Sequence, residues 1–359
     1  MNDKKNVEWV DVKEKTGSAA AKGRLPSMRT CARVAIALIA LAALCSCALA
    51  QELTSEDWYK KGLDLSESGS YEEAVKAYDK AIEIEPENAT FWFAKGQGLL
   101  STTYGPIGLR GEERTAAEEA AIKAYEKAVQ IDPNYTDAWI CKGFILLRIA
   151  TRNSTVDLNK CNESLNSFDK ALELNPRDTN AWQGRGTLLL SLNRVDEAIE
   201  SYDKALEIDP SNIGASQGKA QALAALGRKS ESAKAYDESL EIADRDIETA
   251  NSTENLSQAW MMKGIVLQEQ GRYEDAVKAL DNATDADPKN EMAWKAKGVI
   301  LVNELQRYDE AVQAFDGALQ ANPNDAQVWS LKGDALNASG LQAEAEAAFA
   351  KAKELGYEE

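Results

Sequence analysis

The sequence predicts an all-α protein built as a solenoid of stacked antiparallel helix pairs. The first observation is a recurring phrase, Trp-x-x-(Lys/Arg)-Gly-x-x-Leu, which occurs seven times with a basic spacing of 34 residues. The second is that an alanine-rich helical stretch follows each copy, and the third is the proline that ends most of these stretches. A fixed period of this length indicates a repeat architecture in which each unit buries its apolar face against its neighbours.

The phrase forms the first helix of each predicted pair. The spacing i, i+4, i+7 places its Trp, Gly and Leu on one helical face. We expect the glycine to let the second helix approach closely and an aromatic or leucine side chain to fill the gap. Loss of one buried tryptophan ring is then expected to cost about 3–5 kcal/mol. The copies begin at Trp58, Trp92, Trp139, Trp182, Trp260, Trp294 and Trp329.

The second helix of each pair carries small residues on either side of its aromatic or leucine residue, as in Ala74 and Ala81 around Tyr78. Proline then ends the helix, because it cannot continue the hydrogen-bond ladder. The prolines are Pro86, Pro133, Pro176, Pro210, Pro288 and Pro323.

These positions resemble the tetratricopeptide repeat (TPR) family, with eight repeats over residues 55–359. The resemblance implies a right-handed superhelix. One departure is systematic: a lysine or arginine precedes the glycine, where the family most often has leucine. An acidic residue recurs in the second helix, and we expect an ion pair along the stack worth about 0–1 kcal/mol each. These acids are Asp79, Glu126, Asp169, Asp203, Asp281 and Asp316.

The predicted repeats divide the chain after the first 50 residues. We assign repeats one to five to 51–246, a polar linker to 247–256 and repeats six to eight to 257–359, with loop-like insertions around 101–113 and 151–160. Repeat five lacks the marker residues and has Ser216, Ala220 and Asp244 in their places. The array is therefore either two blocks joined there or one continuous superhelix. Gly356 and Tyr357 replace the last proline, as expected of a terminal cap.

The first 50 residues are expected to direct export. Residues 34–50 form an uncharged apolar run that follows Arg29 and Arg33 and ends in small residues, as in a secretory signal. Translation from Met28 would make that signal compact. A retained anchor and a lipoprotein processed at Cys47 are the alternatives. Each alternative predicts a protein that is secreted or attached to the outer face of the cytoplasmic membrane.

Sequons for N-glycosylation agree with export. Asn153, Asn162, Asn251 and Asn255 are the candidates, because they lie in the repeat-three insertion and the linker. The sequons at Asn88 and Asn134 have another explanation, since Thr90 and Thr136 stand where a helix needs an N-cap. Outside the leader, Cys141 and Cys161 are expected to be free thiols, too far apart for a disulfide.

Composition argues against catalysis. The formal net charge of −18 disfavours nucleic acid as a partner, and the chain has no histidine, the commonest general base and metal ligand. Phosphate-binding glycine loops and nucleophile elbows are missing, and acidic pairs such as Glu72-Glu73 and Glu118-Glu119 are expected on solvated faces. We therefore predict no enzyme, cofactor, metal site or small-molecule substrate.

The resemblance to TPR proteins implies that the chain binds segments of other proteins along an inner groove. We predict a non-enzymatic, exported scaffold for uncharged, partly apolar segments, with Tyr59, Phe93 and Phe144 as anchors. A self-associating structural component of the cell surface is the alternative. Lys295 is followed by Val299, so no repeat has the Lys and Asn pair that grips a terminal carboxylate in some family members. The predicted groove positions are Tyr59, Leu63, Phe93, Gln97, Ile140, Phe144, Gln183, Thr187, Gln217, Gln221, Met261, Ile265, Lys295 and Val299.

Overall fold

A computed structural model of the chain describes residues 53–104, 109, 111–152 and 156–357. Thr54–Glu359 forms one compact unit. The predicted signal, its alternatives and the Met28 start all lie outside the described residues. Within those residues, no helix combines the length and the apolar character needed to span a membrane.

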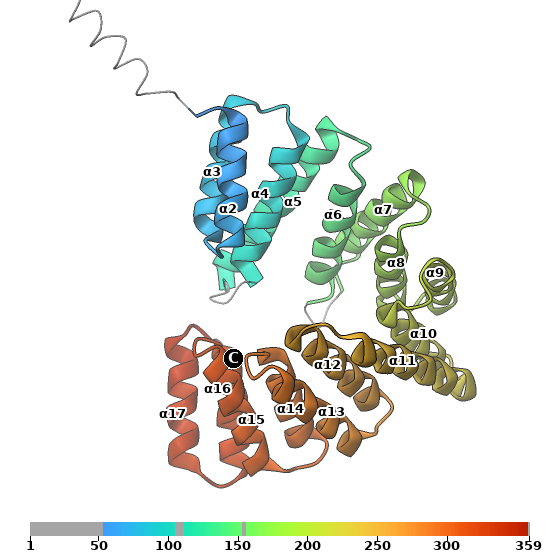
Figure 1. Ribbon diagram of the computed structural model, residues 1–359, viewed down its shortest axis with the longest axis vertical. Helices are drawn as coiled ribbons and strands as arrows, with labels where there is room; N and C mark the ends of the chain where they lie inside the picture. Colours follow the sequence, from blue (N-terminus) through green and yellow to red (C-terminus); the bar gives the residue numbers. More distant parts are fainter. Residues whose placement is uncertain (1–52, 105–108, 110, 153–155, 358–359) are drawn as a thin grey trace, which may run out of the picture. The chain divides into compact units, whose positions relative to one another are not determined.

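The described part of the chain contains sixteen α-helices and no strand, which confirms the all-α solenoid (Figure 1). The first helices of the eight pairs are α2 (Ser55–Glu67), α4 (Ala89–Tyr104), α6 (Thr136–Ala150), α8 (Thr179–Ser191), α10 (Ile213–Ala225), α12 (Thr253–Glu269), α14 (Glu291–Asn303) and α16 (Ala326–Ala338). The second helices are α3 (Tyr71–Ile84), α5 (Gly111–Ile131), α7 (Leu158–Leu174), α9 (Val195–Ile208), α11 (Lys229–Thr249), α13 (Tyr273–Ala286), α15 (Tyr308–Ala321) and α17 (Gln342–Glu354).

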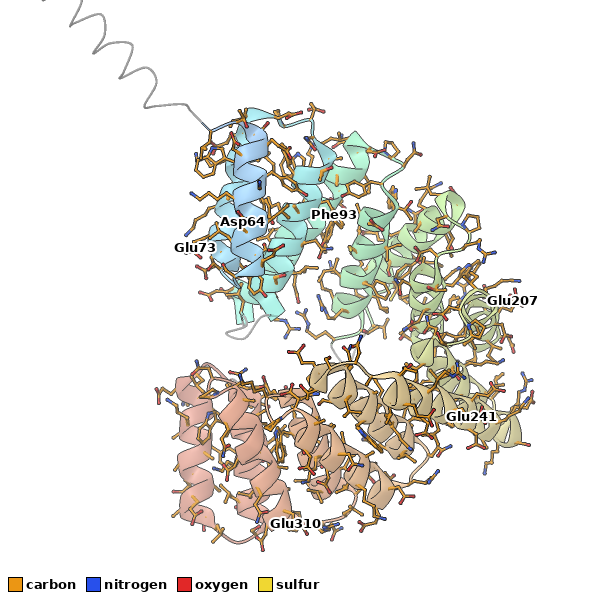
Figure 2. All side chains as sticks on the ribbon, viewed as in Figure 1. Asp64, Glu73, Phe93, Glu207, Glu241 and Glu310 are labelled. Carbon is orange, nitrogen blue, oxygen red and sulfur yellow. The ribbon has the colours of Figure 1, made fainter. Side chains whose placement is uncertain are left out.

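The helices stack in chain order. Each second helix packs against its own first helix and against the first helix of the next pair. Several first helices also contact the next first helix, namely α6 with α8, α8 with α10, α12 with α14 and α14 with α16. The first helices therefore form an inner row, and the second helices lie behind them (Figure 1). The acidic residues Glu73, Glu207, Glu241 and Glu310, labelled in Figure 2, all belong to second helices.

Glycine permits the close contact within each pair, as expected. A Cβ on Gly298 would lie 2.4 Å from the ring of Phe315, and one on Gly143 would lie 2.7 Å from the ring of Phe168. Both distances are shorter than a van der Waals contact allows. Repeat six keeps the same arrangement with Leu280 in place of the ring. Each ring thus packs directly on the backbone of the partner helix.

The tryptophans are only half-buried, which corrects the expectation of a buried ring. At five junctions the indole ring of the following repeat has a specific hydrogen-bond partner in the preceding repeat. The indole Nε1–H of Trp92 donates a 2.8 Å hydrogen bond to the carbonyl of Pro86. Four other junctions repeat this bond, namely Trp139 with Pro133, Trp182 with Pro176, Trp294 with Pro288 and Trp329 with Pro323. Proline therefore both ends a helix and presents an acceptor to the next repeat.

From repeat two onward, the lysine or arginine at the position before the glycine makes an ion pair with the preceding second helix. Lys95 lies 5.5 Å from the ring centroid of Trp92, and its Nζ is 2.6 Å from Asp79 on the preceding second helix. The equivalent pairs are Lys142–Glu126, Arg185–Asp169, Lys219–Asp203, Lys297–Asp281 and Lys332–Asp316. At the next junction Lys263 pairs with Asp244 rather than with Asp237. Repeat six therefore packs two helical turns further along α11.

The junction between repeats five and six is mostly helical. Of the stretch 247–256, only Ala250–Ser252 lies outside α11 and α12. Ser216, which replaces the tryptophan, is buried, and its Oγ donates a 3.1 Å hydrogen bond to the carbonyl of Ala235. The division of the array into two blocks stays a prediction.

Parts of the two insertions extend the neighbouring helices. In repeat two, α4 runs to Tyr104 and α5 starts at Gly111, so both ends of the expected loop are helical. Glu118 on α5 is fully buried, which corrects the expectation of a solvated acidic pair. Its carboxylate accepts from Arg114 at 3.1 Å and from Arg152, which follows α6. An ion-pair cluster therefore joins repeats two and three.

The two ends of the array differ from its interior. The residue before the tryptophan position is buried and apolar in repeats two to eight, but it is the exposed Asp57 in repeat one. Asp64 is exposed as well. The equivalent position in each later repeat holds a buried glycine or apolar residue, such as Gly98 or Ile145. At the other end, Ala350 replaces the acid that would pair with a following lysine. Both ends are thus polar or unpaired, as expected of terminal caps.

Candidate functional site: the inner face of the repeats

The predicted groove residues all lie on first helices, but their exposure varies. Leu63 and Phe144 are 39% and 38% exposed, whereas Tyr59 and Phe93 are half-buried. Ile140 and Met261 are buried and offer almost no surface to a ligand. Their helices contact the next first helix, as α6 does with α8, and this packing covers the side chains.

Aromatic residues gather on the inner face of repeats one to three. The ring of Tyr59 lies 5.1 Å from Phe91, and the ring of Phe93, which is labelled in Figure 2, lies 4.8 Å from Tyr135. In repeat three Phe144 meets Phe168 edge-on, with 5.1 Å between the centroids. The three predicted anchors therefore each have an aromatic neighbour that fixes their orientation.

Tyr135 is a groove residue that the sequence reasoning missed. It stands at the N-cap of α6 and makes no capping hydrogen bond. The same position elsewhere carries a capping side chain, as in Asp178 before α8 and Asn212 before α10. The expectation that Thr90 and Thr136 are N-caps is wrong, because both lie inside their helices and the side chain of Asn88 accepts from the backbone N–H of Thr90. The aromatic residue at a position where the other junctions have a capping side chain was the signal that could have identified Tyr135 from sequence.

Charge and burial shape the environment of this tyrosine. Burial, with smaller contributions from the nearby Tyr59 and Asp137, raises the pKa of Tyr135 to about 12. Burial also raises the pKa of Tyr59, with a smaller contribution from Glu56. Both phenols therefore stay neutral at physiological pH, in surroundings of negative potential.

The two cysteines are free thiols, as predicted. Cys161 is fully buried in the core, and Cys141 is half-buried beside the predicted groove residue Gln97, whose Nε2 donates to its Sγ at 3.4 Å. Burial raises the pKa of Cys141 to about 11. A thiol of this kind is not activated as a nucleophile.

Polar side chains occupy the groove positions of repeats four and five. Thr187 accepts a 3.2 Å hydrogen bond from the hydroxyl of Tyr202, and Gln183 lies against Gly214. Gln217 and Gln221 both donate to the same carboxylate oxygen of Glu269 on α12, at 2.6 and 2.7 Å. The repeat-five amides therefore bind a carboxylate of the chain itself.

The positions of repeats six and seven are only partly accessible. Ile265 and Val299 are half-buried against the core around Leu280. Lys295 binds Gln327 at 2.7 Å and Asp325 at 3.4 Å. These contacts leave repeats one to three as the part of the inner face with accessible aromatic surface.

The junction of repeats seven and eight is expected to make stability depend on pH. Burial and the adjacent Asp325 raise the pKa of Glu291 from 4.5 to about 7. A raised folded-state pKa contributes stability that is full below the unfolded pKa and is lost as pH rises through the folded one. The melting temperature should therefore fall between about pH 4.5 and 7, and Glu291→Gln should flatten this slope. An unchanged slope in Glu291→Gln, measured by thermal circular dichroism, would contradict the assignment.

The glycosylation candidates have different settings. Asn153 lies outside the described residues, and Asn162 is exposed on α7. Asn251 lies between α11 and α12, and its Oδ1 accepts a 2.7 Å hydrogen bond from Asn255. Glycan occupancy at these asparagines stays a prediction. No group of three or more potential metal-ligating side chains occurs in the described part of the chain.

Sequence comparisons agree with this repeat architecture. Profiles described as tetratricopeptide repeat match residues 115–135, 153–213, 189–252, 261–326 and 304–356, and one described as TPR repeat matches 58–99. No curated protein matches the chain.

Solved structures similar to the chain include yeast Tom70, with 19% identity and a TM-score of 0.59 over 86% of this chain and 62% of that one. MamA is 21% identical, with a TM-score of 0.44 over 52% and 96%. YrrB, titled a TPR protein with an unusual peptide-binding site, is 24% identical, with a TM-score of 0.33 over 53% and 92%. At these identities the likeness concerns the fold alone.

The profile matches together cover more than half of the chain, and the helix pairs carry the repeat contacts in order. The chain therefore belongs to the tetratricopeptide repeat family.

Proposed function

We propose that this protein is a non-enzymatic scaffold at the cell envelope that binds a segment of another protein on the inner face of repeats one to three. The observation that carries the proposal is the row of accessible rings on first helices, Tyr59, Phe93 and Phe144. Half-buried aromatic side chains supply large contact area at low entropic cost, which makes them common anchors of protein interfaces. The segment should present mainly uncharged, partly apolar residues to these rings.

The double variant Phe93→Ala/Phe144→Ala tests the binding face. Truncating an anchor ring typically costs at least about 2 kcal/mol of binding, so the two changes should weaken binding by more than about 100-fold. Affinity purification from the native envelope, followed by titration of the purified partner, measures the effect.

The matched control is Ile84→Ala/Leu174→Ala, which removes two exposed apolar side chains from second helices. It should leave binding unchanged. Because Phe93 also contacts Tyr125, circular dichroism must show that the groove variant keeps its fold. A folded groove variant that retains the partner at wild-type affinity would refute the assignment.

The polar ends argue against one form of the self-associating alternative, which is end-to-end stacking. A stacked copy would have to bury Asp57 and Asp64 against α17, where Ala350 provides no acid for Lys61. Asp57 already accepts hydrogen bonds from Thr54, but burying the carboxylate of Asp64 without a partner is costly. A sedimentation experiment in which the protein forms concentration-dependent chains would favour the structural role instead.

Export is proposed from the leader sequence alone. The apolar run 34–50 with its preceding arginines supports translocation of the repeats. Mass spectrometry of the native protein distinguishes the forms: cleavage after Ala50, a retained anchor or a lipid on Cys47. Recovery of the protein, with residues 1–27 attached, from the cytoplasmic fraction alone would refute export.

A further inference from the structure

We propose that Tyr59, Phe93 and Tyr135, named here the Tyr135 cluster, bind a lysine or arginine side chain of the partner segment, with Glu56 and Asp137 as counter-charges. This inference rests on the proposed function, because it assigns the chemistry of one residue in the bound segment. It adds a charged residue to a segment that is otherwise uncharged.

The geometry of the cluster suits a cation. The rings of Phe93 and Tyr135 lie 4.8 Å apart and are tilted by 38°, and all three rings are half-buried, so each keeps accessible surface. Cations bind aromatic faces within about 6 Å of the centroid. The repeats already use this contact, because Lys95 and Lys142 lie 5.5 and 5.8 Å from the centroids of their own tryptophans. Within the described part of the chain, no basic side chain lies over the Tyr135 cluster.

Two exposed carboxylates flank the rings. Glu56 lies one helical turn before Tyr59 on α2, and Asp137 lies two residues after Tyr135. Neither has an ion-pair partner among the described residues, whereas the recurring acids of the second helices pair with lysines or arginines. Glu56 acts electrostatically on Tyr59 and Asp137 on Tyr135, so a cation over the rings would be attracted to both carboxylates. An acidic or purely apolar side chain would leave the carboxylates uncompensated.

At Tyr135 an aromatic ring stands where a capping side chain is expected, and the ring packs against the buried Ala128, Val129 and Ala138. Every junction from repeat three onward presents Asp, Asn or Ser at the N-cap of the next first helix, and only α6 has an aromatic residue there. Exchanging a cap for tyrosine removes a favourable backbone contact. Tyr135 breaks the capping pattern of the first helices, and no other side chain supplies the cap. Such a departure from a local rule indicates a functional position. The ring's packing on Phe93 directs that function to the inner face.

Selection of a random peptide library on the full chain tests the proposal. Parallel selection on Tyr135→Asn, which restores the usual cap, identifies the peptides that depend on the cluster. These peptides should share a lysine or arginine. Synthetic versions with norleucine at that position should bind about tenfold more weakly.

The counter-charges are tested by Glu56→Gln/Asp137→Asn. The matched control is Glu72→Gln/Glu73→Gln, which removes the same charge from exposed positions of α3. The first variant should reduce the preference for the basic residue to about threefold or less, and the control should leave it intact.

The outcomes separate this inference from the proposed function. Peptides that bind the full chain but tolerate norleucine, or that bind Tyr135→Asn equally well, would overturn the cation site and leave the scaffold role standing. If both charge variants lost the preference for the basic residue equally, the preference would come from the overall negative charge. That result would also overturn the cation site. If no peptide is enriched at all, both proposals fail.

Discussion

Replacing Gly298 by valine is expected to lower the free energy of unfolding by about 3 kcal/mol or more, the upper part of the range for overpacked cores. The first added carbon already falls 2.4 Å from the Phe315 ring. That ring is fully buried among the closely packed residues of repeats six to eight, so it has no free space to enter. Glycine is also the poorer helix former, so intrinsic propensity would predict a small gain instead. Urea unfolding followed by circular dichroism measures the sign and size of the change in the free energy of unfolding.

Two further variants isolate the cause of this loss. Asn303→Val places valine at an exposed position of the same helix and should change stability by less than about 0.5 kcal/mol. Repeat five carries alanine at the equivalent position, so Ala220→Gly should cost about 1 kcal/mol through helix propensity. If Gly298→Val were no worse than Asn303→Val, the steric explanation would be wrong. Because repeat arrays often unfold in stages, hydrogen exchange in α14 and α15 should localise the loss.

Periodic features of this chain could be predicted from sequence because each is repeated in most units. The i, i+4, i+7 spacing and the small glycine identify the contact face without any structure. The lysine and acid positions recur in register, so the Lys95–Asp79 pair and its equivalents were also predictable. Proline was assigned only its role in ending the helix. Its carbonyl partner, the indole of the next repeat, depends on how two units dock.

Features that occur once were the ones that sequence reasoning missed. Glu118 has the same appearance in sequence as the exposed Glu119, and only the placement of Arg152 beside α5 makes it a buried acceptor. Glu269 likewise belongs to repeat six but binds the amides of repeat five. These contacts depend on the local shift or curvature of the stack, which no single helix encodes. The prediction that Ile140 is accessible in the groove was wrong for the same reason.

The groove and the core also share residues, which limits how the binding face can change. Phe93 and Tyr59 contact rings that belong to the buried core, including Tyr125 and Tyr78. Tyr135 likewise packs against the buried Ala128, Val129 and Ala138, but its replacement by asparagine restores the usual helix cap, which should offset part of the lost packing.

Glu118→Gln should destabilise the chain by about 2–3 kcal/mol, the range for charge-assisted hydrogen bonds to a buried group. The variant keeps the shape of the side chain but removes the charge shared by Arg114 and Arg152, whose side chains are 34% and 29% exposed. The neighbouring Glu119→Gln is the matched control, since that carboxylate is exposed and should contribute less than about 0.5 kcal/mol. Urea unfolding measures the midpoints of both variants. Equal shifts would contradict the role of Glu118 in a buried ion-pair cluster. The loss from Glu118→Gln should also persist in high salt, because a buried ion pair is screened far less than the exposed pairs of the second helices.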